Sequence, residues 1–336
     1  MATIYDIAAK AGISPKTAAR ILSGETQRSK SKKVVLEWAE RLGYVRDANA
    51  ANLRTGSTQI AGLLVPFIDN PYYTSVIQEF HNVLAEKGFR VSVACSFGRA
   101  DEVVAALKGF RSYNVDGIFF NGSEGELTPE IVGLLEQFQS AGKPVMLSGC
   151  NQGRLAVDQA DVANAVGIVK VVTYLARQGH ERIAFVGGRK ANATQNARLE
   201  GFQEGLEKCG IPRNDAWISF GETSPIDAGR RCAKILATTE PKRPTAIVCG
   251  NDIMAMGVIK TVIKSGLKVP KDVAVTGFDD IEQASLFVPG ITTLRQPIDR
   301  IAQDCVNQFV RRVAEKDFAN PQQYLHELEL VVRESA

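Results

Sequence analysis

The sequence predicts an α/β protein in which a small all-α helix-turn-helix headpiece precedes two doubly wound lobes built on parallel sheets. Three observations lead to this fold class. Two short helical patterns separated by a glycine stand at the start of the chain. From residue 59 onward, short apolar runs that end in Gly, Asn or Asp alternate with amphipathic stretches, which is typical of parallel sheets covered by helices. The length of 336 residues exceeds what one compact core usually holds.

The helix-turn-helix pattern occupies residues 3–22. The first helical stretch keeps its isoleucines on one face, and Gly12 supplies the permissive backbone that a sharp corner needs. Ser14 is placed to cap the second helix, with Pro15 at the first helical position, where a missing N–H removes no hydrogen bond. Because the second helix of such a pair lies in the DNA major groove, the pattern indicates sequence-specific DNA binding.

A third helix is expected from about residue 30 to residue 42, where apolar residues fall at helical spacing. Lys30, Lys32 and Lys33 crowd its start, although cations are unfavourable at a helix N-terminus. Phosphate contact explains this arrangement, and a solvated surface is the alternative. The first 58 residues hold ten Lys and Arg against five Asp and Glu, whereas the remainder holds 30 against 32. A basic head on a nearly neutral body is typical of a DNA-binding module joined to another domain.

Residues 46–58 are small and polar, and Leu53 is their one large apolar side chain. A segment of this composition buries little surface by itself, so we expect a linker or a marginal helix. Leu53 either contacts the next domain or acts as a wedge between base pairs in the minor groove. The predicted organisation is a headpiece at 1–45, a hinge at 46–58 and a core at 59–336.

The core contains eight strand candidates in two sets of four, separated around residues 158–179. The candidates cover residues 60–66, 90–96, 117–122, 143–149, 182–188, 216–221, 245–252 and 273–280. Their nearly continuous apolar side chains indicate parallel sheets buried on both faces. We expect the first lobe at 59–160 with about 291–321, and the second at 161–290 with about 322–336. Because ligands of such sheets bind beyond the carboxyl ends of the strands, two facing lobes should form a binding cleft.

Several classes of function are disfavoured by the motifs that are absent. The sequence has no glycine-rich phosphate loop, GxSxG motif or paired metal ligands, so we expect neither an enzyme nor a cofactor or metal. The six cysteines lie apart without CxxC spacing and are expected to be reduced core residues. No apolar run is long enough to span a membrane, and the start of the chain does not read as a signal peptide, so a cytoplasmic protein is expected.

Motifs along the chain recur in the order and spacing of a known family. In the headpiece they are Thr3, Ile4, Asp6, Ala8, Ala11, Gly12, Ser14, Thr17 and Arg20, followed by Leu42-Gly43-Tyr44. In the core they are Gly179-His180, Arg198-Leu199, Gly201-Phe202, Asn251-Asp252, Gly277-Phe278-Asp279-Asp280 and Thr292-Thr293-Leu294-Arg295-Gln296-Pro297. Along nearly its whole length, the chain resembles the LacI/GalR family of bacterial transcription regulators. The resemblance implies a periplasmic-binding-protein-like core and a homodimeric repressor that binds a pseudo-palindromic DNA operator under control of a small effector.

The resemblance also implies roles for residues of the headpiece and the hinge. Lys16 and Arg20 fall where the family reads bases, and lysine or arginine suits guanine O6 and N7. Three hydroxyl-bearing residues fall where the family contacts phosphates, namely Tyr5, Ser14 and Thr17. Leu53 matches the leucine that members insert into the minor groove, and Ala50 the small residue through which two hinge helices pack.

In the expected cleft, the resemblance implies six effector-binding residues, which are Asp69, Tyr72, Tyr73, Arg198, Asn251 and Asp279. Amide and carboxylate groups suit sugar hydroxyls, which need both donors and acceptors. A sugar or sugar derivative is therefore the expected effector, with a nucleoside or a sugar acid as alternatives. Other roles stay open for these residues. Arg198 and Asp279 could form an internal salt bridge across the cleft, Asn251 could be a strand-end cap, and the two tyrosines could pack against a helix.

The chain departs from the family pattern in the hinge and in the presumed pocket. Arg46-Asp47 stand where the hinge usually begins Pro-Asn, and Gly149-Cys150 replace an Asp that usually ends the fourth strand. Glu222-Thr223-Ser224 stand where an aromatic residue is common. The effector of any one member therefore does not transfer to this chain. A solute-binding protein of a transport system is the alternative function, but it predicts an export signal and no basic head.

Overall fold

The computed structural model describes residues 2–22, 31–44, 57–122, 127–149, 155–190, 192–237 and 243–336. The chain divides into two compact units, residues 1–58 and 59–336, and each unit has a hydrophobic core of its own. Ala50 and Leu53, to which the sequence assigns DNA-binding roles, lie outside the described residues, as do Lys30 and Cys150. No helix among the described residues is long and apolar enough to cross a membrane.

The headpiece is a bundle of α1 (Ile4–Ala11), α2 (Pro15–Leu22) and α3 (Lys32–Arg41). Thr3 begins α1 with a capping box, in which its own backbone N–H donates to Asp6 Oδ2 at 2.8 Å. Gly12 ends α1 at a φ of +66°, in the left-handed region that glycine occupies without strain. One apolar side chain from each helix is nearly or fully buried at the centre, namely Ile7, Ile21 and Val35.

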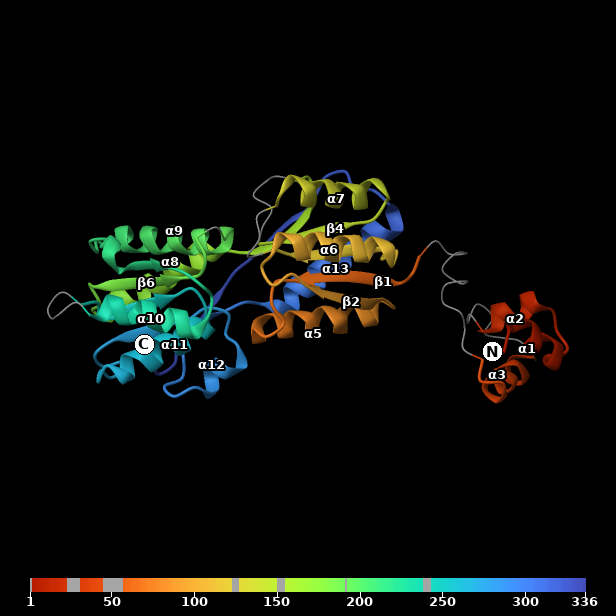
Figure 1. Ribbon diagram of the computed structural model, residues 1–336, viewed down its shortest axis with the longest axis horizontal. Helices are drawn as coiled ribbons and strands as arrows, with labels where there is room; N and C mark the ends of the chain where they lie inside the picture. The colour runs from red at the N-terminus through yellow and green to blue at the C-terminus, as the bar shows by residue number, and fades with distance from the viewer. Residues whose placement is uncertain are drawn as a thin grey trace. The chain divides into compact units, whose positions relative to one another are not determined.

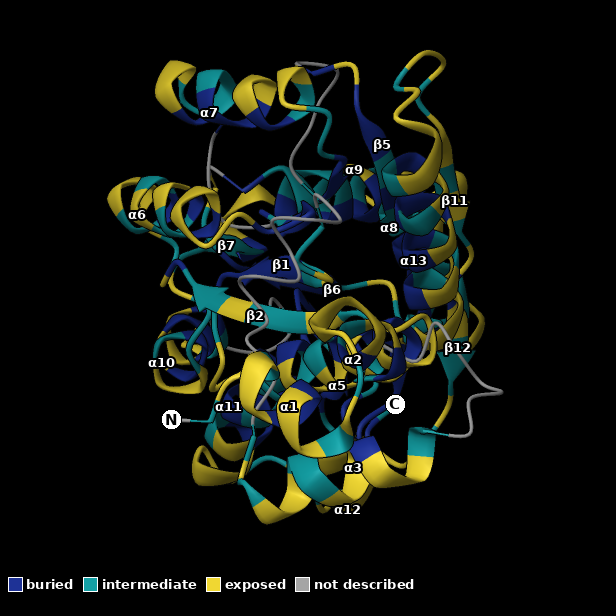
Figure 2. Cartoon of the chain, turned by 90° about the vertical axis from the view of Figure 1, so that its right-hand side faces the viewer, coloured by how far each residue is buried: buried dark blue, intermediate teal, exposed yellow. Residues whose placement is uncertain are grey.

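The first lobe has a six-stranded parallel sheet in the order β11-β5-β4-β3-β1-β2. Its strands are β1 (Ile60–Val65), β2 (Arg90–Cys95), β3 (Gly117–Asn121), β4 (Val145–Ser148), β5 (Asp158–Val162) and β11 (Gln323–His326). Helices α6 (Ala100–Ser112) and α7 (Pro129–Ser140) cover one face of this sheet (Figure 1). Helices α5 (Pro71–Glu86) and α13 (Ile298–Glu315) cover the other face. Figure 2 shows the central strand β1 buried and the edge strand β2 partly exposed.

The second lobe has a four-stranded parallel sheet in the order β7-β6-β8-β9. Its strands are β6 (Ile183–Gly187), β7 (Ile218–Phe220), β8 (Ala246–Cys249) and β9 (Ala274–Thr276), and a 3-10 helix (Asp215–Trp217) precedes β7. Helices α8 (Asn164–Arg177) and α9 (Ala193–Lys208) pack on one face, and α10 (Pro225–Leu236) and α11 (Asp252–Lys264) on the other (Figure 1). The short helix α12 (Glu282–Leu286) and the antiparallel pair β10 (Thr293–Arg295) and β12 (Glu329–Val331) complete the lobe.

All eight predicted strands are present, and the predicted fold class is confirmed, but the first sheet has two strands that the sequence did not predict. Neither β5 nor β11 has a continuous apolar run, since β5 reads Asp-Gln-Ala-Asp-Val and β11 reads Gln-Tyr-Leu-His. Asp158, the first residue of β5, is buried because Arg312 of α13 pairs with it through two contacts, Nη2–Oδ1 at 2.8 Å and Nε–Oδ2 at 2.9 Å. A buried ion pair from distant segments therefore supports a strand that hydrophobic pattern does not indicate.

The chain passes between the lobes three times, between β5 and α8, between β10 and α13, and between β11 and β12. Two predicted lobe limits differ from the structure. The return to the first lobe comes after β10 rather than near residue 291, because Leu294 packs in the core of the second lobe. The final return comes after β11 rather than near residue 322, because β11 pairs with β5 in the first sheet.

Candidate functional site

The headpiece presents polar side chains on the outer face of α2. Lys16, Thr17 and Arg20 are exposed and share one face of the helix, while Ile21 points into the bundle. Ser14 Oγ accepts the backbone N–H of Thr17 at 3.1 Å, as the predicted cap requires. Two cations and a hydroxyl on one short helix are the groups that contact base edges and phosphates in a major groove.

Two other residues of the headpiece bear on this surface. Tyr5 of α1 is 70% exposed, so its hydroxyl is accessible to a phosphate. Ala18 of α2 is fully buried, so its methyl group is not available to a base. Its burial follows from the helical period, because Ala18 lies on the same side of α2 as Ile21.

A cleft lies between the two lobes of the core, and its empty volume is about 1010 Å³, including the solvent at its mouth. Both lobes and the β10–α13 connection contribute to its lining. Five of the six effector-binding residues that the resemblance implied line this cleft, namely Tyr72, Tyr73, Arg198, Asn251 and Asp279. Asp69 is exposed and is not among the lining residues, whereas its neighbour Asn70 lines the cleft and caps α5 by accepting the N–H of Tyr72 at 3.1 Å.

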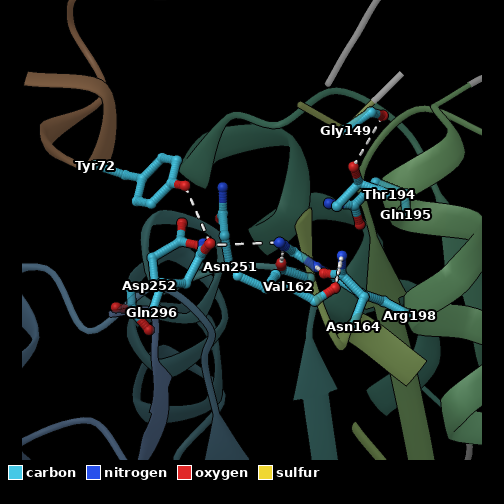
Figure 3. A network of polar contacts seen from close by, with 12 residues as sticks. Tyr72, Gly149, Val162, Asn164, Thr194, Gln195, Arg198, Asn251, Asp252 and Gln296 are labelled. Atoms are coloured by element: carbon cyan, nitrogen blue, oxygen red, sulfur yellow. Dashed lines mark hydrogen bonds and ion pairs between the residues drawn. The ribbon is translucent and has the colours of Figure 1, made fainter. Parts of the chain in front are cut away.

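The pair Arg198–Asp279 forms the charged centre of the cleft. Arg198 Nη2 lies 4.0 Å from Asp279 Oδ1, and each side chain is 7% exposed. The guanidinium also donates from Nε to Asn164 Oδ1 at 2.9 Å (Figure 3). Its Nη1 donates to the carbonyl of Gly250. Its carbon lies 3.5 Å above the ring centroid of Phe278, which holds the plane of the guanidinium in place.

The electrostatics of this pair are governed by burial. Burial raises the pKa of Asp279 from 3.8 to about 6, although Arg198 and the side chain of Gln296 lower it in part. Burial also lowers the pKa of Arg198, against the opposing effect of Asp279. The attraction across 4.0 Å therefore does not fully offset the loss of water around either charge. Arg198 and Asp279 are both in the second lobe, so their contact does not cross the cleft as the salt-bridge alternative supposed.

Asp279 is also held in an unusual backbone conformation. Its φ is +115°, a value that residues other than glycine rarely adopt. Its backbone N–H donates to the carbonyl of Leu294 at 2.9 Å. Backbone strain of this kind costs on the order of 1–3 kcal/mol and is concentrated at functional sites. The strain and the perturbed pKa fall on one carboxylate that lines the cleft, which makes Asp279 the strongest candidate for ligand contact.

Tyr72 connects the first lobe to this centre. Its hydroxyl donates to Gln296 Oε1 at 3.0 Å (Figure 3). Gln296 Nε2 in turn donates to Asp279 Oδ1 at 2.8 Å. The neighbouring Tyr73 is 6% exposed and packs in the first-lobe core, with its ring edge-to-face on Tyr72 at a centroid distance of 5.1 Å. Tyr72 therefore belongs to the polar network, whereas Tyr73 combines core packing with a place in the cleft wall.

Asn251 acts as a cap and also lies in the wall of the cleft. It is the N-cap of α11, with its Oδ1 accepting the N–H of Met254 at 2.9 Å, and it also lines the cleft. The helix N-terminus that it caps carries a partial positive charge.

Further polar lining residues were not predicted from the sequence, namely Asn121, Ser148, Asp161, Asn164, Asn192, Thr194, Gln195, Thr223 and Gln296. Thr194 Oγ1 donates to the carbonyl of Gly149 at 3.4 Å and so links the two walls of the cleft (Figure 3). Asp161 accepts the N–H of Gly149, which places a carboxylate beside the end of β4. The signal for Gln296 was present in the motif Thr292–Pro297, but no local pattern marks Asp161, because its strand was not predicted.

The comparisons with known proteins agree with this architecture. A model of the periplasmic-binding-protein-like domain matches residues 172–336. A repressor of Yersinia pestis bv. Antiqua (strain Antiqua), the HTH-type transcriptional repressor PurR, is 32% identical over 318 residues, which are 94% of this chain and 92% of that protein. The chain belongs to the LacI/GalR family of transcription regulators.

Solved structures of this fold cover nearly the whole chain. The lac repressor dimer bound to operator and the anti-inducer ONPF has a TM-score of 0.87 at 22% identity, over 99% of this chain and 98% of that one. A complex of the transcriptional regulator CelR with cellobiose has a TM-score of 0.73 at 24% identity and covers 100% of both chains. As a member of the LacI/GalR family, the chain is a DNA-binding transcriptional regulator and not an enzyme, as the sequence predicts.

Proposed function

We propose that this LacI/GalR member is a cytoplasmic, homodimeric repressor whose affinity for its operator is controlled by a carbohydrate or carbohydrate derivative bound in the interlobe cleft. The pair Arg198–Asp279 carries the proposal, because its two buried charges are incompletely compensated and face the space where a ligand would lie. Hydroxyl groups both donate and accept, so they complement a guanidinium, a carboxylate and the amide of Asn251 together.

The DNA-binding part of the proposal rests on the outer face of α2. Lys16 and Arg20 read base edges, while Tyr5, Ser14 and Thr17 hold phosphates and set the register. One headpiece covers a half-site, so two chains related by a two-fold axis read a pseudo-palindromic operator. Ala50 and Leu53 are proposed to act in the hinge, as the small packing residue and the minor-groove wedge.

Coupling between effector and operator is proposed to pass through the relative position of the lobes. A ligand that contacts both walls of the cleft favours one arrangement of the lobes, and only such differential binding can shift the equilibrium. The lac repressor dimer bound to operator and the CelR–cellobiose complex have this fold, which supports a site for DNA and a site for a sugar on one chain.

A thermal-shift screen of the full chain with neutral sugars, sugar acids and nucleosides tests the effector part. A ligand at a hundredfold its Kd should stabilise the protein by about 2.7 kcal/mol. The same ligand should then change operator affinity in a gel-shift titration, in either direction. If no hydroxyl-bearing ligand moves the melting transition, the carbohydrate proposal is wrong.

The substitution Leu53→Ala tests the hinge. It should weaken operator binding strongly and leave effector affinity unchanged, because the wedge contacts DNA alone. Equal operator affinity of the variant and the parent protein would contradict the wedge role.

A further inference from the structure

We infer that the effector is amphipathic and carries no negative charge, with a hydroxyl- or amine-bearing head on the second lobe and an apolar substituent inside the first lobe. This inference rests on the proposed role of the cleft as the effector site, and it narrows the chemical class of the ligand. Two features of the cleft support it. An apolar recess opens into the first lobe, and the polar part of the lining has more acidic than basic side chains.

The recess extends from the cleft into the first lobe, between its sheet and the layer of α5 and α13. Phe119 and Met146 come from adjacent positions of β3 and β4, Val76 and Phe80 from α5, and Cys305 from α13. All five are at most 5% exposed, yet all five line the cleft. The cleft thus reaches core side chains that water scarcely touches, and an apolar group is the occupant that such walls favour.

The recess is open because two of the side chains that line it, those of Ala160 and Cys305, are small. Ala160 of β5 lies on the same sheet face as Met146, because in-register neighbours of a parallel sheet point to the same side. Cys305 faces it from α13. A larger residue at either position would fill space that is now part of the cleft. Each methylene that a ligand places there should raise its affinity by about fourfold, the equivalent of about 0.8 kcal/mol per buried methylene.

The charges of the polar side disfavour an anion. Among the described lining residues, the acidic side chains are Asp161 and Asp279, and the basic side chain is Arg198. Arg198 already donates to Asn164 and to Gly250 and stacks on Phe278. An added carboxylate or phosphate would meet two carboxylates against one engaged cation in a region of low dielectric constant. A neutral hydroxyl donates to these carboxylates without that repulsion, and an ammonium group adds attraction.

The two features lie at opposite ends of one path through the cleft. Tyr72 stands between them, since its ring packs in the first-lobe layer while its hydroxyl reaches Gln296 beside Asp279. A ligand with a polar head and an apolar substituent would therefore contact both lobes at once. Such contact is what an effector needs in order to favour one arrangement of the lobes.

Three small probes that share a phenyl ring test the inference without knowledge of the sugar, namely benzyl alcohol, benzylamine and benzoate. Titration of the full chain by calorimetry and by ligand-observed NMR at pH 7.5 should give saturable millimolar binding of benzyl alcohol, and equal or tighter binding of benzylamine. Benzoate should bind at least about tenfold more weakly, which corresponds to about 1.4 kcal/mol. Benzoate binding as tight as that of benzyl alcohol, or no saturable binding of benzyl alcohol, overturns the inference.

Recess-filling variants show where the probes bind. Ala160→Val and Cys305→Leu should each lower the affinity for benzyl alcohol by at least about tenfold, because the larger side chains occupy the space that the phenyl ring would take. Ala94→Val adds the same volume on the opposite face of the sheet, in the α6–α7 cluster, and should change affinity by less than about twofold. Circular-dichroism melting verifies that each variant is folded, and at least one of the two recess variants must retain the parent's melting transition. Unchanged benzyl alcohol binding in such a folded variant places the ring elsewhere and overturns the inference.

These experiments distinguish a failure of the amphipathic-ligand inference from a failure of the proposed function. Phenyl probes that bind in the recess while no carbohydrate alters operator affinity would support the amphipathic site and refute the carbohydrate effector. If a purely polar or anionic sugar changes operator affinity and none of the phenyl probes binds saturably, the carbohydrate effector is supported and the amphipathic site is refuted.

Discussion

Each lobe of the core contains a buried Arg–Asp pair, and the two pairs differ in how completely their charges are compensated. In the first lobe, Arg312 and Asp158 make two hydrogen bonds of 2.8 and 2.9 Å, and their side chains are 2% and 4% exposed. In the second lobe, Arg198 and Asp279 are separated by 4.0 Å, with both side chains 7% exposed. Pairing raises the pKa of Arg312, whereas burial lowers the pKa of Arg198.

The surroundings of the two pairs explain their different roles. Asp158 Oδ1 also accepts from Gln308 Nε2 at 3.0 Å and from the N–H of Gln322 at 2.7 Å, so the carboxylate is fully engaged within the protein. Among the residues that the structure describes, Gln296 is the side chain that donates a hydrogen bond to Asp279, which lies on the wall of the cleft. Residue type and burial are nearly the same in the two pairs, so the distance between the charges and the number of further hydrogen-bond donors distinguish the compensated pair from the uncompensated one.

The largest expected effect comes from breaking the compensated pair. Asp158→Ala leaves the guanidinium of Arg312 buried without its carboxylate and should reduce the free energy of unfolding by about 3–5 kcal/mol. Urea denaturation followed by circular dichroism measures the change. Asp101→Ala is the matched control, because it removes an aspartate from an exposed pair with Arg99 and should leave the urea midpoint nearly unchanged. Equal midpoints for Asp158→Ala and Asp101→Ala would show that the buried pair is not structural.

The uncompensated pair should appear in the pH dependence of stability. Because the pKa of folded Asp279 is about 6 and its ordinary value is 3.8, the folded protein keeps a proton that the unfolded chain loses in between. Stability from this group therefore falls as the pH rises from about 4 to about 6, by at most about 3 kcal/mol.

In Asp279→Asn, the free energy of unfolding should fall less steeply between about pH 4 and about pH 6. Asp161 and Asp252, whose pKa values burial also raises, should keep part of the slope. Urea midpoints at pH 4.5, 5.5 and 7 measure it. Identical slopes for the variant and the parent protein would show that Asp279 titrates as an ordinary carboxylate.

Arg20, which is exposed on the headpiece, extends the comparison with Arg198 and Arg312. Arg20→Ala should weaken operator binding by about 1–3 kcal/mol and relax the choice of one base, while the stability of the core stays the same. Gel-shift titration against operators with single base changes measures both effects. Lys10→Ala, a cation of α1, is the control and should weaken all operators alike or not at all. Unchanged base preference in Arg20→Ala would exclude Arg20 from base reading.

The smallest expected effect concerns the link between the first lobe and the uncompensated pair. Tyr72→Phe removes the hydrogen bond to Gln296 and should reduce the free energy of unfolding by about 0.5–1.5 kcal/mol. It should also weaken a ligand that spans the cleft. Tyr113→Phe removes a hydroxyl from a tyrosine that is 71% exposed and should have no effect on either measurement. A larger loss in Tyr113→Phe than in Tyr72→Phe would contradict the role of this link.

Much of the headpiece and of both sheets could be predicted from the sequence alone. Gly12, Ser14 and Pro15 act through the backbone within a few residues, so their effects follow from local chemistry. The eight predicted strands carry apolar runs whose burial follows from composition. The family motifs added the cleft positions of Arg198, Asn251 and Asp279, since each lies in a motif of its own.

Tertiary structure alone decided the features that depend on pairs of distant residues. Asp158 of β5 is compensated by Arg312, more than 150 positions away in the sequence, and Asp161 of the same strand lines the cleft. The 4.0 Å gap between Arg198 and Asp279 and the recess beside Ala160 are properties of packing, which no local pattern encodes. A sequence specifies which groups are present, but only the fold determines which of their charges and surfaces stay uncompensated and available to a ligand.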